Sequence, residues 1–165
     1  PGLLTVPESL RGGLVVAGPR AGSKTEELTI PEGLGPDITG LSTKVTFVES
    51  LPPFAPMALE GGGAFMKWRE ALETRDSVIL HLEEGAPAAV RKGQMIYIAG
   101  WPDATGWRRL LDMLAEQAGL DLMDLPPDLR LRETDSHRFW FNYGPRAVTY
   151  QNITLPAAGV HWEVK

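Results

Sequence analysis

The chain has 165 residues, of which 43% are hydrophobic and 22% are charged, so it can bury one sizeable core and stay soluble. Its 16 basic and 21 acidic side chains give a net charge of −5, and they form no basic stripe of the kind that a nucleic-acid groove requires. The absence of cysteine excludes disulfides, thiolate chemistry and cysteine-ligated zinc. The 18 glycines and 14 prolines exclude a helical bundle and favour short elements joined by turns.

The opening of the chain is typical of a piece of a longer protein. It starts with Pro1 rather than methionine, and the apolar run 14–17 already predicts a strand covered on both faces. Such a strand needs neighbouring strands and crossover helices, and the first dozen residues supply few. No segment has the pattern of a membrane span or a signal peptide, so we expect a soluble, cytoplasmic fragment.

Three further elements are predicted up to residue 82. Alternation over 44–49 indicates a strand. A short helix is predicted over 64–75, because Phe65, Trp68 and Leu72 share one face at helical spacing. The apolar run 78–82 indicates another strand.

A hairpin and a long helix are predicted next. Strands over 88–91 and 95–99 flank Lys92-Gly93, which is a plausible tight turn, so the two strands should pair. The helix is predicted over 104–118, with Asp103 or Thr105 as its N-cap and Gly119 at its end. Its apolar stripe consists of Trp107, Leu110, Leu111, Leu114 and Ala118.

The pattern changes near residue 125. Segments 129–132, 138–143 and 160–165 alternate with period two and have no helix between them, which predicts a small antiparallel sheet. We therefore predict an α/β part over 1–124 and an all-β module over 125–165. A module of that size is marginal alone and should lean on a neighbouring domain.

One segment comes close to a phosphate-binding loop. Residues 18–25 follow the first strand, but the loop pattern requires glycine where this chain has Ser23 just before Lys24. The acidic pair Glu26-Glu27 would also repel a phosphate. A strand-to-loop connection is the favoured interpretation.

Other chemistry-bearing residues form no recognisable site in the sequence. Adjacent carboxylates at Glu83-Glu84 diverge, so they are not a glycosidase pair. His81, His137 and His161 lack metal-ligand spacing, and no serine lies in a nucleophile motif.

The aromatic residues of the tail allow two interpretations. Phe139, Trp140, Phe141, Tyr143 and Trp162 could stack on a sugar, but at least half of them are expected in the core, so packing is favoured. Trp101-Pro102 follows a strand end, where ligands of open α/β sheets bind. No active site emerges from composition and spacing alone.

Several segments together, in order, resemble bacterial β-galactosidases of glycoside hydrolase family 42. The segments are Leu14-Val15-Val16-Ala17-Gly18-Pro19-Arg20-Ala21-Gly22-Ser23-Lys24-Thr25 with the following Glu26 to Pro31, Val48-Glu49-Ser50-Leu51, Trp68 with Glu70, Tyr97-Ile98-Ala99-Gly100-Trp101-Pro102 and Arg138-Phe139-Trp140-Phe141-Asn142-Tyr143-Gly144.

The resemblance implies a position within a three-part enzyme. Family members look like a (β/α)₈ barrel with two catalytic glutamates, a middle α/β domain that mediates trimer formation, and a small β domain. The middle domain is similar to class I glutamine amidotransferases, with a flavodoxin-like open sheet. Residues 1–124 would then be the later part of the middle domain, truncated at its N-terminus, and residues 125–165 the terminal β domain.

The resemblance carries over no catalytic residue, no cofactor and no metal ligand, because the family's catalytic glutamates and metal-binding cysteines lie in the barrel. Gly18, Pro19, Arg20 and Gly22 at the strand-to-loop turn, and Trp101-Pro102, are expected to matter structurally.

The expected function is that of a non-catalytic oligomerisation and scaffold segment. Its partners would be the parent's barrel and further copies, as a trimer, with no nucleic acid or membrane. The parent would hydrolyse terminal β-D-galactosides by a retaining, two-carboxylate mechanism. The alternative is a free-standing module that binds a sugar or a phosphorylated ligand through residues 18–25 and the tail aromatics. A degenerate amidotransferase is disfavoured, because the required nucleophilic cysteine is missing.

Overall fold

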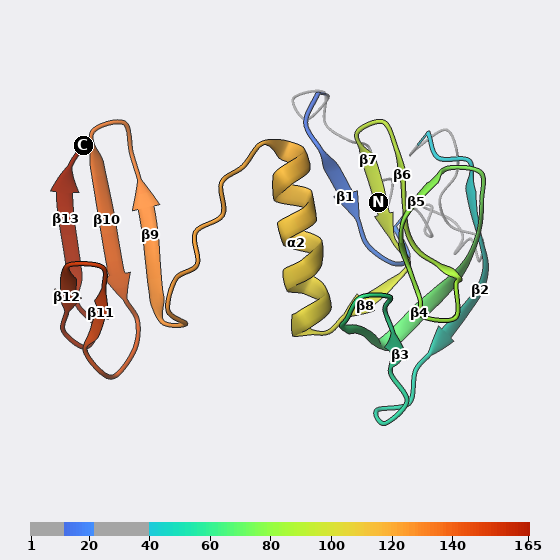
Figure 1. Cartoon of the computed structure of the whole chain (residues 1–165), viewed down its shortest axis with the longest axis horizontal. Coiled ribbons are helices and arrows are strands. Elements are labelled where there is room, and N and C mark those ends of the chain that lie inside the picture. The colour runs from blue at the N-terminus through green and yellow to red at the C-terminus, as the bar shows by residue number, and fades with distance from the viewer. Residues whose placement is uncertain (1–11, 22–39) are drawn as a thin grey trace, which may run out of the picture. The chain divides into compact units, whose positions relative to one another are not determined.

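The computed structural model describes residues 12–21 and 40–165, which are mostly β-strand with one α-helix (Figure 1). The chain divides into two compact units, Pro1–Leu120 (unit 1) and Asp121–Lys165 (unit 2). Unit 1 contains β1 (Val15–Ala17), β2 (Thr43–Ser50), β3 (Met57–Ala58), β4 (Ala64–Thr74), β5 (Ser77–His81), β6 (Pro87–Lys92), β7 (Met95–Ile98), β8 (Gly100–Pro102) and α2 (Ala104–Ala118). Unit 2 contains β9 (Leu129–Glu133), β10 (His137–Asn142), β11 (Val148–Tyr150), β12 (Ile153–Leu155) and β13 (Val160–Val164).

The first sheet of unit 1 has the order β1-β7-β6-β5, with β1 parallel to β7 and the other pairs antiparallel. Its strands confirm those predicted over 14–17, 78–82, 88–91 and 95–99, and β6 and β7 form the predicted hairpin. Strand β7 is buried along its whole length, whereas Val16 of β1 is 42% exposed. Coverage of the first strand on both faces, as predicted, is therefore not observed among the described residues.

The second sheet is built on β4. Strand β2 pairs with β4 on one side, while β3 and β8 pair with β4 elsewhere, all antiparallel. The predicted strand over 44–49 is confirmed as β2. The chain passes from the first sheet to the second at Ala99, between β7 and β8.

The predicted helix over 64–75 is wrong, because this segment is strand β4. Phe65 and Leu72 are seven residues apart, so a regular strand would place them on opposite faces, yet both are buried. The backbone is irregular between them, with Lys67 at a φ of 66° and a shift in the pairing with β8. An irregularity of this kind changes which side chains face the core, and it produces an apolar spacing that mimics a helix.

Helix α2 confirms the helix predicted over 104–118. The Asp103 side chain accepts a hydrogen bond from the N–H three residues on, at 2.7 Å, and Gly119 ends the helix with a φ of 66°. Leu110 and Leu114 are buried, whereas Leu111, placed in the predicted apolar stripe, is 52% exposed. Among the described residues, no helix has the length and apolar character that crossing a membrane requires.

Unit 2 is a small antiparallel structure, as its sequence pattern predicts. Strands β13, β10 and β9 form one sheet, and β11 and β12 form a hairpin (Figure 1). The core consists of Leu129, Trp140 and Leu155, with hairpin side chains packed against it. The expected α/β part followed by a β module is thus met in part: the fold is β-rich, with a parallel strand pair and one helix in unit 1.

We expect Gly100→Ala to lower the free energy of unfolding by about 1–3 kcal/mol, the usual cost of overpacking a core. A Cβ at Gly100 would lie 2.3 Å from the ring of Phe65, which is itself 1% exposed. The matched control is Gly18→Ala, because a Cβ at Gly18 would meet no atom within 4 Å. Urea unfolding of the two variants is the measurement, and equal midpoints would contradict the packing described.

Candidate functional site

Residues from three of the motifs meet inside unit 1. Arg20 follows β1, Glu70 lies on β4, and Tyr97 lies on β7, the parallel neighbour of β1. The backbone N–H of Glu70 also donates to the carbonyl oxygen of Ala99, at 2.6 Å. Arg20, Glu70 and Tyr97 are called the Glu70 cluster below. The cluster joins the turn after the first strand to both sheets.

Both oxygens of the Glu70 carboxyl accept hydrogen bonds in the cluster. The backbone N–H of Arg20 donates to Oε1 at 2.9 Å, and the Tyr97 hydroxyl donates to Oε2. The same N–H lies 3.2 Å from the Tyr97 hydroxyl oxygen. Arg20 has a φ of 66°, which residues other than glycine seldom adopt, and in this conformation its N–H reaches the buried carboxyl.

Burial dominates the electrostatics of the cluster. Glu70 is 2% exposed and Tyr97 is fully buried. Desolvation raises the pKa of the Glu70 carboxyl above its ordinary value, and the hydrogen bonds from Tyr97 and Arg20 offset part of that rise. Burial also raises the pKa of the Tyr97 hydroxyl, and the neighbouring Glu70 raises it further.

The cluster has the properties of a structural anchor. A general acid or base must come within hydrogen-bonding reach of a substrate. Here both carboxyl oxygens and the hydroxyl are engaged by one another and by backbone, beneath the protein surface. What the arrangement can do is hold the turn that contains Gly18, Pro19 and Arg20, where the Ala21 N–H donates to the Gly18 carbonyl at 3.2 Å.

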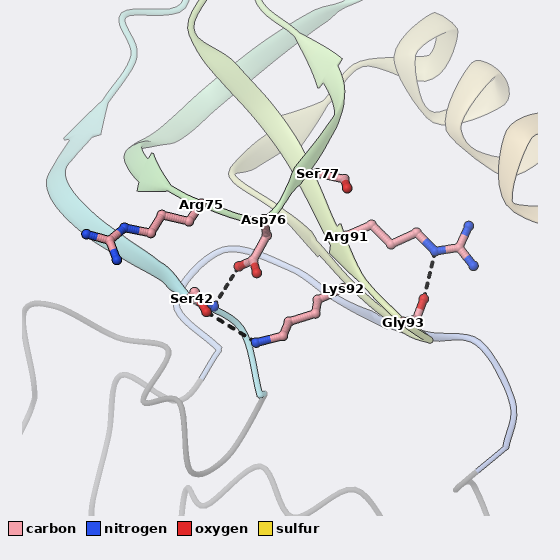
Figure 2. Close-up of a pocket in the computed structure, with 7 residues that line it drawn as sticks. All are labelled: Ser42, Arg75, Asp76, Ser77, Arg91, Lys92 and Gly93. Carbon is pink, nitrogen blue, oxygen red and sulfur yellow. Dashed lines mark hydrogen bonds between the residues drawn. The ribbon is translucent and has the colours of Figure 1, made fainter.

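A shallow pocket lies elsewhere in unit 1, and Figure 2 shows it. Asp76 accepts hydrogen bonds there from the Ser42 N–H and the Thr43 hydroxyl, both at 2.6 Å. The side chains of Arg75 and Arg91 extend in different directions, so the cationic groups do not converge on one ligand position (Figure 2). The pocket is lined by Ser42, Arg75, Asp76, Ser77, Arg91, Lys92 and Gly93.

The remaining residues of the near-phosphate loop, Gly22, Ser23, Lys24 and the following Glu26-Glu27, lie outside the described residues. Trp101 on β8 is 53% exposed, and its ring meets that of Trp107 edge-on at 6.1 Å between centroids. Pro102 is buried beside it.

The ionisable residues singled out in the sequence lie apart from the Glu70 cluster. Glu84 forms an ion pair with Arg69 at 3.3 Å, and His81 lies 3.7 Å from a carboxylate oxygen of Glu60. His137 and His161 lie on β10 and β13 of unit 2. Across residues 12–21 and 40–165, histidine, aspartate and glutamate form no group of three that could hold a metal ion.

The tail aromatics correct an expectation. At least half of the five tail aromatics are expected in the core. Of the five, only Trp140 is buried there, at 2% exposed. Because strand residues alternate between faces, the others share the opposite side of the sheet with His137. We call this side the aromatic face, formed by His137, Phe139, Phe141, Tyr143 and Trp162.

The partnership of Glu70 and Tyr97 does not emerge from the sequence patterns. Its signal is an acidic residue two positions from Trp68 and two from Leu72, on the buried side of a strand. The helix predicted over this segment hides that signal, because on a helix Glu70 would not lie on the same side as the apolar residues.

No protein-family model matches the chain. Sequence relatives are nevertheless clear. The chain is 45% identical over 141 residues to a β-galactosidase of Thermus thermophilus, a match that covers 82% of this chain and 22% of that protein. A β-galactosidase of a Thermus sp is 44% identical over the same coverage. The chain spans about a fifth of the length of these curated relatives.

Solved structures give the same result. The β-galactosidase of the psychrophilic Marinomonas ef1 superimposes with a TM-score of 0.82 and 30% identity, over 98% of this chain and 28% of that one. A catalytic mutant of a glycoside hydrolase family 42 β-galactosidase from G. stearothermophilus shares the fold, with a TM-score of 0.74 and 16% identity, over 99% and 31% of the two chains.

These matches relate the chain to part of a glycoside hydrolase. More narrowly, it is similar to part of β-galactosidases, which confirms that part of the resemblance carried by the motifs, and it shares its fold with a family 42 β-galactosidase. The partial coverage is consistent with a C-terminal fragment of such an enzyme.

Tyr97→Phe is expected to lower the free energy of unfolding by about 1–3 kcal/mol, the cost of leaving a buried polar group short of a partner. The substitution keeps the ring but removes the hydroxyl that donates to Glu70. Tyr143→Phe is the control, because Tyr143 is 72% exposed. Chemical denaturation should separate the two variants, and a neutral Tyr97→Phe would show that the buried hydrogen bond contributes nothing.

The raised pKa of the Glu70 carboxyl predicts that the stability of the protein depends on pH. Because its pKa is raised in the folded protein, the native state keeps the proton to a higher pH than the unfolded chain does. The stabilisation that comes from the protonated Glu70 carboxyl is therefore complete below the pKa of glutamate in the unfolded chain, roughly 4.3. It is lost as pH rises through the pKa of Glu70 in the folded protein. The neutral variant Glu70→Gln should lack this loss, so its stability relative to the wild type should rise with pH.

The measurement is the free energy of unfolding in urea, from about pH 4.3, the unfolded glutamate value, to slightly alkaline pH. Glu73→Gln serves as the control, since Glu73 is exposed on the same strand. Parallel curves for the wild type and Glu70→Gln would show that the folded carboxyl titrates like one in the unfolded chain.

Proposed function

We propose that the chain is the non-catalytic C-terminal portion of a family 42 β-galactosidase and serves as its oligomerisation and scaffold segment. The observation that carries the proposal is that the motif residues have a structural role. Arg20, Glu70 and Tyr97 form hydrogen bonds with one another inside unit 1 instead of lining a cavity. The match to about a fifth of longer β-galactosidases supports the assignment to a part of such an enzyme.

The proposal includes a division of the chain. Residues 1–124 would be the later part of a class I glutamine amidotransferase-like, flavodoxin-like domain, and residues 125–165 the terminal β domain. The parallel pair β1–β7 and the helix that follows β8 support the first assignment. So does Val16, because parallel strands are normally buried on both faces, and its exposure leaves one face of β1 open to a covering element.

The proposed partners follow from this assignment. One is the parent's (β/α)₈ barrel, which would hydrolyse terminal β-D-galactosides by a retaining mechanism with its two carboxylates. The others are further copies of the chain, assembled as a trimer through unit 1. The proposed segment uses no cofactor and binds neither nucleic acid nor membrane, and its parent enzyme would be cytoplasmic. The net charge of −5 favours partners other than nucleic acid.

The second candidate is a free-standing module that binds a sugar or a phosphorylated ligand. The aromatic face supports the sugar half of this candidate, because Tyr143 and Trp162 are 72% and 57% exposed. Such a module would occur naturally as a protein of 18.0 kDa, whereas the first proposal requires a several-fold larger gene product.

A deletion series in the T. thermophilus relative tests the scaffold role. Removing the segment that matches this chain is expected to convert a trimer into monomers, measured by sedimentation equilibrium. Removing only the part that matches unit 2 is the control and should leave the trimer, because oligomerisation is assigned to unit 1. The purified 165-residue chain should hydrolyse no chromogenic β-galactoside.

Two outcomes would contradict the proposal separately. A trimer that survives the longer deletion would remove the oligomerisation role. Turnover of the β-galactoside by the isolated chain would remove the assignment as non-catalytic.

A further inference from the structure

Unit 2 covers one side of its sheet and leaves the other open. In the strand pairing, Phe139 lies opposite Trp162 on β13 and Arg132 on β9, and Phe141 lies opposite Val160 and Arg130. These side chains therefore share the aromatic face. The hairpin β11–β12 packs on the other side, where Trp140 contacts Tyr150 at 5.5 Å between ring centroids.

The aromatic face is a continuous apolar surface. Along β10, ring centroids follow one another at 5.9, 6.4 and 6.1 Å from His137 through Phe139 and Phe141 to Tyr143. Trp162 joins the row at 5.5 Å from His137. On β13, Val160 and Val164 are 56% and 67% exposed. A contiguous apolar patch of this kind marks an interaction site on a soluble protein.

The small core of unit 2 indicates that this partner stays in place. Its fully buried apolar residues are Leu129, Trp140 and Leu155. A three-stranded sheet with one hairpin is close to the size below which a domain needs additional support. A transient ligand would leave the aromatic face in water for much of the time, whereas a permanent protein neighbour would add the missing apolar burial.

The charges on the face specify the neighbour further. Arg130 and Arg132 border the aromatic row along β9, and the described strands place no carboxylate on this face. The Arg130 guanidinium already donates to the carbonyls of Pro127 and Leu129, while Arg132 is exposed. A second copy would offer these guanidinium groups no carboxylate from its own aromatic face. The complementary surface is apolar with carboxylates along one edge.

We propose that the aromatic face docks permanently onto the part of the full-length β-galactosidase chain that lies outside these 165 residues, on an apolar surface bordered by carboxylates. This inference rests on the proposed function. It assigns Phe139, Phe141, Tyr143 and Trp162 to the centre of the interface and Arg132 to its charged edge.

Hydroxyl-radical footprinting of the full-length enzyme tests the docking. Trp162 should be oxidised about tenfold more slowly there than in the 165-residue chain, because the centre of a packed interface excludes water. Trp140 is the internal reference, since it is 2% exposed within unit 2 itself. If unit 2 does not fold within the 165-residue chain, Trp140 will react rapidly there, and the full-length enzyme then decides alone: Trp162 should be as slow as Trp140.

A charge pair of variants in the full-length enzyme tests the carboxylate border. Arg132→Glu is expected to raise the oxidation of Trp162 severalfold, because it places a carboxylate against carboxylates. Arg132→Lys keeps the charge and should leave the rate unchanged. Equal rates in both variants would overturn the proposed charge complementarity.

Other occupants of the face would give different results, and each would overturn the proposal. Protection of Trp162 that grows with the concentration of the isolated chain would indicate a second copy. Protection on adding galactose or lactose would indicate a sugar platform.

Rapid oxidation of Trp162 in an active full-length β-galactosidase would contradict the docking and leave the proposed function intact. Slow oxidation in a full-length protein without that activity would keep the docking and remove the proposed function.

Discussion

Unit 1 is organised around a carboxyl group that has been taken out of water. Glu70 has lost its hydration, and in return its two oxygens receive the Arg20 N–H and the Tyr97 hydroxyl. These donors come from the turn after β1 and from β7, while Glu70 belongs to β4 in the other sheet. Because the bond to Ala99 lies where the chain crosses between sheets, the position of the turn and the join of the two sheets depend on the same group.

Much of the fold could be predicted from the sequence wherever one local rule decides the structure. The hairpin through Lys92-Gly93 has a turn suited to its strands, and α2 has a capping aspartate, an apolar stripe and a terminating glycine. The strands of unit 2 alternate without interruption. Strand β4 is not predictable in this way because its irregularity near Lys67 changes the period, and only the pairing with β2 and β8 reveals it.

The site is harder to predict than the fold, for a physical reason. The motifs that contain Arg20, Glu70 and Tyr97 indicate which family the chain resembles. They do not reveal that these residues meet, because a hydrogen bond between residues 50 or 77 positions apart leaves no local pattern. At least half of the tail aromatics are predicted to lie in the core, since alternation gives the face of each residue but not which face is covered. That depends on the β11–β12 hairpin, which packs on the Trp140 side alone.

The contact between Phe65 and Gly100 restricts how sequences of this fold can diverge. Because the ring occupies the space in which a Cβ at position 100 would lie, a larger residue there is tolerated only after Phe65 has become smaller. The reverse order begins with a cavity in the core, which is also costly. Each single step therefore passes through a less stable protein, while the double change need not, so the two positions are expected to vary together rather than independently.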